Sequence, residues 1–257
     1  MQTSLIVKGA ISVEHKEVFR ALVGSHHYNL NTESSDYDYK VFVTPCFDEL
    51  YEGVKYIKPT LIDSFDVDVH DIRRVPSLLW KANVGFLEIL FTHEFVVGSQ
   101  VCEETKRLMD ELLGMKRDIA KMNIPHVYNS CMGMYYDKMR QMLRGSEGTQ
   151  DLVAKYGYDT KSAMHSIRIL DFLQRFADSD FEDFEYAISY NDGDSFRNFL
   201  LDVRNGEYTL EQVREIIKDM FYVVKEEYTN KYRQMESNET TYQKVVNIVK
   251  QIVKNEM

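Results

Sequence analysis

Alternating apolar and polar positions predict two β-strands in the first third of the chain. Residues 37–44 read YDYKVFVT, which is rich in β-branched and aromatic side chains. Residues 65–70 read FDVDVH, where every second side chain is apolar. Because successive side chains of a strand point to opposite faces, Asp66, Asp68 and His70 should share the polar face of the second strand.

Helical spacing predicts helices on either side of these strands. Residues 12–22 are expected to form a helix that ends at Gly24, and residues 77–91 carry an apolar stripe with helical periodicity. The resulting order is helix, turn, strand, strand and helix. That order is typical of an α/β or α+β module.

Beyond about residue 100 the pattern is almost wholly helical. We expect helices over residues 101–115, 126–144, 160–176, 194–205, 209–232 and 240–256. Thr209 followed by Gln212 indicates a capping box at the start of the fifth helix. The sequence therefore predicts an α+β fold in two domains. Residues 1–98 would form a small mixed sheet with helices, and residues 99–257 an all-helical domain with a cleft between the two.

Composition narrows the class of protein. The chain of 257 residues has a formal net charge of -10, which disfavours wrapping of nucleic acid as its main role but leaves room for a local basic groove. Its three cysteines, Cys46, Cys102 and Cys131, lack CxxC spacing and predict neither a disulfide framework nor a zinc site. His15 shows no partner spacing either. No window approaches the roughly 18 apolar residues of a membrane span, so we expect a cytoplasmic protein.

The segment before the first strand carries the candidate chemistry. Gly24-Ser25 is expected to form a tight turn whose backbone N–H groups and hydroxyl can meet phosphate oxygens. Asp36 follows Ser25 by eleven residues, and Asp38 comes two residues later. In an extended strand this spacing puts both carboxylates on one face, about 7 Å apart. Such like charges repel unless a cation lies between them, although a DxD pair alone is also typical of a solvated strand face or an Asx turn.

Three blocks of the sequence resemble a known family. They are GSHHYNLNTESSDYDYKVFV at residues 24–43, the stretch over residues 66–91, and KYGYDTKSAMHSIRIL at residues 155–170. The first block resembles the Gly-Ser and DxD signature of the polymerase β nucleotidyltransferase superfamily. Together the blocks resemble more closely the RlaP-type, RNA repair pathway DNA polymerase beta family, so we expect a polymerase β-type module followed by a helical domain that closes the nucleotide cleft.

The resemblance implies a metal site made of carboxylates. Asp36 and Asp38 would bind two Mg²⁺ (or Mn²⁺) ions, since these ions accept one or two protein carboxylates together with phosphate oxygens. A third carboxylate on the neighbouring strand would complete the site. Alignment favours Asp66, and Asp68 stays open because it shares the same face.

The resemblance also implies a nucleotide site. Gly24, Ser25 and His26 would contact the nucleotide, with Ser25 on the β- and γ-phosphates. His26 stands where the family usually has an arginine, and its loss removes a planar fork for phosphate.

A basic helix face in the third block extends this site. Lys161, His165 and Arg168 follow one another at helical spacing, behind a credible N-cap at Asp159 or Thr160. A basic stripe is usually a solvated face, but the resemblance implies that this one clamps the triphosphate. Tyr158 would stack on the base or the sugar.

The expected reaction transfers a nucleoside monophosphate from an NTP, such as ATP, to an acceptor hydroxyl or phosphate and releases pyrophosphate. The acceptor stays open between an RNA end, a protein hydroxyl and a small molecule, and the acidic net charge favours the last two. The alternative is a catalytically inactive nucleotide-binding or regulatory module. The cluster of carboxylates argues against it, because such a cluster is costly without a metal to hold.

Overall fold

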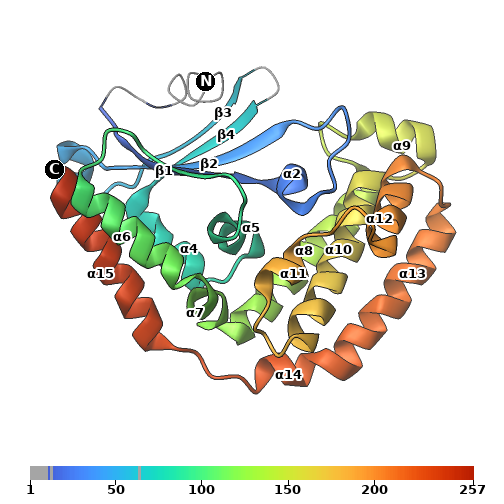
Figure 1. Ribbon diagram of the computed structural model, residues 1–257. Coiled ribbons are helices and arrows are strands. Elements are labelled where there is room, and N and C mark those ends of the chain that lie inside the picture. Colours follow the sequence, from blue (N-terminus) through green and yellow to red (C-terminus); the bar gives the residue numbers. More distant parts are fainter. Residues whose placement is uncertain (1–10, 12–13, 63–64) are drawn as a thin grey trace. The chain divides into compact units, whose positions relative to one another are not determined.

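A five-stranded mixed sheet organises the first part of the chain in the computed structural model, which describes residues 11, 14–62 and 65–257 (Figure 1). Its strands are β1 (Glu17–Val23), β2 (Tyr37–Val43), β3 (Ile57–Ile62), β4 (Phe65–Asp71) and β5 (Phe95–Val97). They lie in the order β3-β4-β2-β1-β5. β2 and β4 are parallel, whereas the other neighbouring pairs are antiparallel. β1, β2 and β4 therefore each have a strand on both sides.

One face of the sheet is an apolar core. Val67 and Val69 of β4 are fully buried together with Val41 of β2, and Phe65 packs against this cluster. The predicted alternation in residues 65–70 is therefore confirmed. It directs Asp66, Asp68 and His70 to the opposite face, because strand side chains alternate.

The helix predicted over residues 12–22 is wrong. Residues 12 and 13 lie outside the described part of the chain, and residues 17–23 (EVFRALV) form strand β1. This strand pairs with β2 on one side and β5 on the other, and both of its faces are largely buried. A strand buried on both faces loses its polar alternation, so that its apolar run cannot be told from a buried helix by periodicity.

The single helix predicted over residues 77–91 is also wrong. The chain forms α4 (Val75–Trp80), α5 (Val84–Leu87) and the 3₁₀ turn η2 (Glu88–Leu90) instead. Ala82 has a left-handed backbone (φ 50°), which no continuous helix contains. The Asn83 side chain then accepts the N–H of Gly85 at 2.9 Å and starts a new helix as its N-cap.

The chain divides into two compact units. One comprises Met1–Asn123 with Asn238–Met257, and the other comprises Ile124–Ser237. Their limits differ from the predicted domains 1–98 and 99–257, because residues 99–123 and the C-terminal helix belong with the sheet. The helices of the sheet unit not yet named are α2 (Gly24–Tyr28), α3 (Phe47–Glu52), α6 (Glu103–Gly114), α7 (Lys116–Lys121) and α15 (Glu239–Glu256).

The second unit is helical throughout its regular elements, as predicted. It contains α8 (Ile124–Arg144), α9 (Gln150–Tyr156), α10 (Thr160–Asp178), α11 (Phe184–Ile188), α12 (Ser195–Asn205), α13 (Leu210–Val223), a π-helical turn η3 (Val224–Tyr228) and α14 (Thr229–Arg233). The capping box of Thr209 and Gln212 is confirmed at the start of α13. Within the described residues, no helix is long and apolar enough to cross a membrane.

A half-buried ion pair fastens the C-terminal helix to the segment before β1. The Lys16 ammonium, just before β1, donates to Glu256 Oε2 at 2.6 Å, and the Cys102 N–H before α6 donates to Glu256 Oε1 at 2.8 Å. Burial alone would raise the pKa of Glu256, but these bonds outweigh it and lower the pKa to about 2. One carboxylate thus joins three segments that are far apart in the sequence.

We expect Glu256→Gln to lower the free energy of unfolding by about 2–3 kcal/mol at pH 7, because it removes the charge that Lys16 faces. The folded-state pKa of Glu256 is depressed, so its stabilisation is present above the unfolded pKa of 4.5 and is lost as the pH falls toward about 2. Urea unfolding at several pH values measures the effect. The exposed Glu111→Gln on α6 is the control, and a pH-independent difference would contradict this assignment.

Candidate active site

The parallel pairing of β2 and β4 brings two of the predicted carboxylates together. Asp38 lies directly opposite Asp66 in the register of the two strands. Neighbouring strands are about 4.8 Å apart, so these carboxylates lie side by side on the face opposite the apolar core. Asp66 is exposed and Asp38 is half-buried. Asp36 lies one residue before β2 and is exposed.

The predicted Gly-Ser turn lies beside Asp38. β1 ends at Val23, which faces Asp38 across the antiparallel pair, and Gly24 follows with a left-handed backbone (φ 71°). A Cβ atom on Gly24 would lie 2.2 Å from Asp38 Oδ2, so only glycine fits here. Ser25, in the first turn of α2, is half-buried next to this contact.

Glu88 supports the Gly24 turn by hydrogen bonds, and the sequence did not indicate it as a site residue. Its buried carboxylate accepts the Tyr28 hydroxyl at 2.8 Å and the Gly24 N–H at 3.4 Å. A buried carboxylate is costly unless it is hydrogen-bonded, which explains why it reaches both ends of α2. The available signal was one acidic residue within the apolar run from Phe86 to Leu90.

Asp68 is held by two donors, the Lys40 ammonium and the His70 ring. Lys40, which lies opposite Asp68 in the register, approaches its Oδ2 at 3.4 Å, and His70 Nε2 lies 2.7 Å from the same oxygen. Burial would raise the pKa of Asp68, but the His70 hydrogen bond and the Lys40 charge outweigh it and lower the pKa. Arg74 faces the other ring nitrogen of His70 and can only donate, so that His70 directs its Nε2–H to Asp68.

His26 lies in an aromatic row at the start of β2. Its ring stacks on Tyr37 with centroids 4.0 Å apart, and Tyr37 stacks in turn on Phe65. Its Nε2 lies 3.3 Å from the Ser35 carbonyl oxygen. These contacts tie the end of the loop before β2 to helix α2. The predicted contact of His26 with nucleotide stays a prediction.

The predicted basic face lies on α10 of the helical unit. Asp159 is the N-cap, as predicted, and accepts the Ser162 N–H at 2.9 Å. Lys161 is exposed, His165 is half-buried and Arg168 is buried. These three residues therefore differ in their access to solvent, and only Lys161 is on the surface.

Two further cations surround His165, and both were missed because they come from other helices. Burial lowers the pKa of His165 well below its usual range, and nearby positive charges lower it further. These charges belong to Arg168, Lys138 on α8, Lys161 and Arg204 on α12. Close packing of α10 against α8 and α12 brings them together. A group of cations with a neutral histidine at its centre suits the binding of an anion.

Tyr158 does not lie at a surface. It is fully buried, and its hydroxyl donates to the Tyr208 carbonyl at 2.7 Å. This placement favours a packing role over the predicted stacking on a base, because no face of the ring is exposed.

The matching family model defines the class of protein, a polymerase β-like family. The chain belongs to the RlaP, RNA repair pathway DNA polymerase beta, family, whose model matches residues 8–248. No curated protein sequence matches the chain. Among solved structures, a nucleotidyltransferase-like protein from Exiguobacterium sibiricum 255-15 is similar, with 11% identity, 98% of this chain and 73% of that chain covered, and a TM-score of 0.27.

Gly24→Ala is expected to destabilise the protein more than Gly53→Ala. Both glycines have φ 71°, where a non-glycine residue costs about 1–2 kcal/mol. At Gly53 nothing lies within 4 Å of an added Cβ, whereas at Gly24 it meets the Asp38 carboxylate. We expect an additional loss of about 1 kcal/mol or more at Gly24 from this overlap. Urea unfolding measures both variants, and equal losses would show that the Asp38 contact is unimportant.

The stability of the helical unit should depend on His165 below neutral pH. Its folded pKa lies below the unfolded value of 6.5, so the unfolded chain binds more protons as the pH falls. The wild type should therefore lose stability relative to His165→Asn between pH 7 and 5, by up to about 1.4 kcal/mol per pH unit.

The stability of the wild type must be compared with that of the variant at each pH, because Asp171 changes the stability in the opposite direction. Burial raises the pKa of Asp171 to about 6, so its contribution to stability grows as the pH falls. Urea unfolding followed by circular dichroism measures the difference. His126→Asn, an exposed histidine on α8, serves as the control and should leave the slope unchanged.

Proposed function

We propose that the protein transfers a nucleoside monophosphate from an NTP to an acceptor hydroxyl or phosphate and releases pyrophosphate. The observation that carries this proposal is the pair of carboxylates, Asp38 opposite Asp66, beside the Gly24 turn. Family membership supports the reaction class. We infer that the catalytic residues are Asp36, Asp38 and Asp66.

The residues fit a pair of divalent cations such as Mg²⁺ or Mn²⁺. Asp38 and Asp66 are like charges on adjacent strands, and no ion pair to Asp66 is present among the described residues. Such a pair is unfavourable unless a cation neutralises it, and hard cations prefer oxygen ligands. When bound, these ions would stabilise the charge of the attacking and leaving oxygens. The exposed Asp66 carboxylate is suited to accept the proton of the acceptor hydroxyl.

Asp66 is the better candidate for the third carboxylate, and Asp68 a positioning residue. The Lys40 ammonium and the His70 N–H already engage Asp68 Oδ2. A carboxylate with two internal donors gains less from a metal ion than one without them. Asp68 would instead hold Lys40 beside Asp66, on the same face of the sheet.

The turn at Gly24 would position the phosphates of the nucleotide. Its left-handed glycine lets the backbone pass close to Asp38, and the buried Glu88 holds both ends of α2. The Ser25 hydroxyl, next to this turn, would bind the β- and γ-phosphates. Glu88 is thus a positioning residue in this proposal, because it acts through the turn.

The cations around His165 are proposed to bind phosphate in the helical unit. The exposed Lys161 would make the first contact, and Lys138 and Arg204 extend the predicted basic face beyond a single helix. If this face binds phosphate, Lys161→Gln should bind nucleotide or RNA more weakly than the wild type. Lys218→Gln, at an exposed lysine on α13, is the control and should bind as the wild type does.

Among the acceptors, the family name supports an RNA end. A protein hydroxyl and a small molecule are the other outcomes of the same assay. A catalytically inactive nucleotide-binding module is the second candidate function. It would bind an NTP with Mg²⁺ in a thermal-shift measurement and yet transfer no label to any acceptor.

Label transfer from α-³²P-NTPs to RNA with free ends, to total protein and to small hydroxyl compounds tests the proposal. Asp38→Asn and Asp66→Asn should each reduce transfer by about 100-fold or more, since the lost ligand stabilises the transition state. Asp68→Asn should reduce transfer less, because in this proposal Asp68 positions Lys40 and does not bind the metal ions.

The exposed Asp110→Asn on α6 controls for loss of a surface charge. Transfer that persists in Asp38→Asn would exclude the proposed site. Equal losses in Asp66→Asn and Asp68→Asn, with both variants folded, would contradict the division of roles between them.

A further inference from the structure

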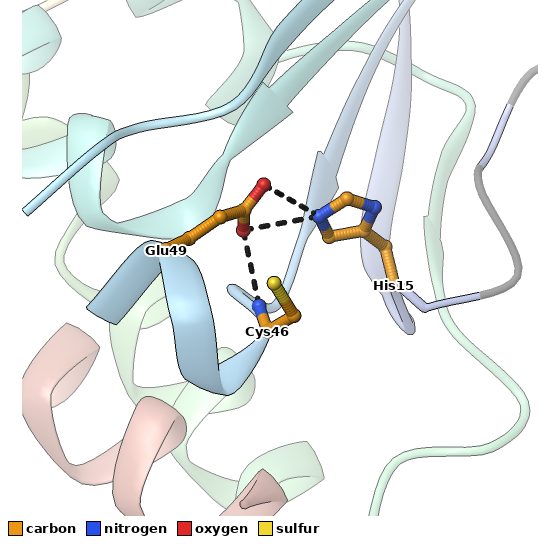
Figure 2. A group of neighbouring side chains, drawn as sticks. All are labelled: His15, Cys46 and Glu49. Carbon is orange, nitrogen blue, oxygen red and sulfur yellow. Dashed lines mark hydrogen bonds and ion pairs between the residues drawn. The ribbon is translucent and has the colours of Figure 1, made fainter. Parts of the chain in front are cut away.

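A second group of metal-ligating side chains lies at the far end of β2. His15, Cys46 and Glu49 each offer one ligand atom, and these atoms all lie within 4.8 Å of one another. Figure 2 shows the three side chains pointing toward one another, with the Cys46 sulfur directed to the gap between the carboxylate and the ring. His15 Nε2 lies 3.0 Å from both carboxylate oxygens of Glu49.

The backbone pairing of β1 and β2 explains why these residues meet. The ladder continues beyond its last strand pair, because the Thr44 N–H donates to the Lys16 carbonyl at 2.9 Å and the Lys16 N–H donates to Thr44 Oγ1 at 3.2 Å. His15 lies one residue before Lys16, and Cys46 lies two residues after Thr44. Glu49 is brought in by helix α3, which begins at the residue after Cys46.

Each ligating group is already held in place. The Cys46 N–H donates to Glu49 Oε2 at 3.0 Å as part of a capping box. The Tyr56 ring lies against the His15 ring, with centroids 4.2 Å apart. Arg73, which pairs with the buried Asp71, donates to the Glu49 carbonyl at 3.4 Å and holds α3. Such orientation by surrounding groups lowers the entropic cost of binding an ion.

We propose that His15 Nε2, Cys46 Sγ and the Glu49 carboxylate bind one Zn²⁺ ion, with a fourth position open to water. One nitrogen, one sulfur and one oxygen form a donor set that suits Zn²⁺ and does not suit Mg²⁺, which prefers oxygen ligands. Tetrahedral bonds of about 2.0–2.3 Å place ligand atoms about 3.3–3.6 Å apart. The present separations therefore need only small side-chain rotations. On binding, the Cys46 thiol releases its proton to solvent and the His15 ring carries its proton on Nδ1.

The proposed ion is separate from the proposed catalytic cations. Asp38 lies near the start of β2 and Cys46 lies beyond its end, eight residues later. At about 3.3 Å per residue this separates the two places by roughly 25 Å of chain. The ion would bridge the segment before β1 to helix α3, and we expect it to raise the stability of the sheet unit.

We expect the site to bind Zn²⁺ weakly enough for the ion to exchange with solvent. His15 Nδ1 is buried, and within the described residues it has no hydrogen-bond partner. Ligating histidines usually donate this second N–H to a neighbour, and such partners change metal affinity by about 10–100-fold. With three protein ligands and no such partner, the ion should be removable by a chelator.

Binding of Zn²⁺ and Co²⁺ to the chelator-treated protein tests the proposal. We expect one equivalent of Zn²⁺ to be retained in the presence of millimolar Mg²⁺, and Co²⁺ to give the near-ultraviolet absorption band of a thiolate ligand. Cys46→Ser should abolish the band. His15→Gln and Glu49→Gln should weaken Zn²⁺ binding by at least about tenfold, as the loss of a direct ligand exceeds the loss of a supporting contact.

Two controls separate this site from others. Cys102→Ser, at an exposed cysteine outside the cluster, should keep the thiolate band. The double variant Asp38→Asn, Asp66→Asn should keep it as well, even if label transfer is lost, so that failure of either proposal is recognised independently. Circular dichroism and a thermal unfolding curve establish that each variant is folded. A band that survives in folded Cys46→Ser, or no retained Zn²⁺ in the wild type, would overturn the proposal.

Discussion

The parallel register between β2 and β4 is the constraint on which the candidate site depends. It places Asp38 opposite Asp66 and, one pair further along the same face, Lys40 opposite Asp68. The same two strands thus produce one like-charge pair and one opposite-charge pair. The second pair neutralises itself, whereas the first brings two like charges together, an arrangement that a bound cation would stabilise. A slip of one residue would bury the acidic face and expose Val67 and Val69, so the apolar core fixes the charges as well.

Buried carboxylates join separate segments of the sheet unit. Glu88 takes hydrogen bonds from both ends of α2, Asp71 pairs with Arg73, and Glu256 joins α15 to the start of β1 and of α6. Each of them has internal donors, because an isolated buried charge is strongly unfavourable. The acidic residues behind the net charge of -10 therefore include buried carboxylates with a structural role as well as candidate metal ligands.

The helical unit shows the opposite electrostatic arrangement. Around His165 the neighbouring groups that shift its pKa are all cations, and burial also opposes its protonation. This cluster exists because α8, α10 and α12 pack together, although their basic residues are far apart in the sequence. The site of His15, Cys46 and Glu49 has the same origin, since strand pairing and a short helix bring its three members together. Neither the full set of cations around His165 nor the group of His15, Cys46 and Glu49 could be recognised from its spacing in the sequence.

The sequence alone determined the family and most of the helical unit, because both depend on local patterns. The Gly-Ser and DxD blocks, the alternation in residues 65–70 and the capping box of Thr209 are readable within a few residues. It failed at β1, where burial of both faces removes the polar alternation that marks a strand, and at Ala82, where a left-handed residue breaks the apolar stripe. The alternation alone could not separate Asp66 from Asp68, because both share a face, although the family resemblance favoured Asp66. Only the tertiary structure showed which one already has Lys40 and His70 as partners, since those contacts arise from strand register rather than from sequence spacing.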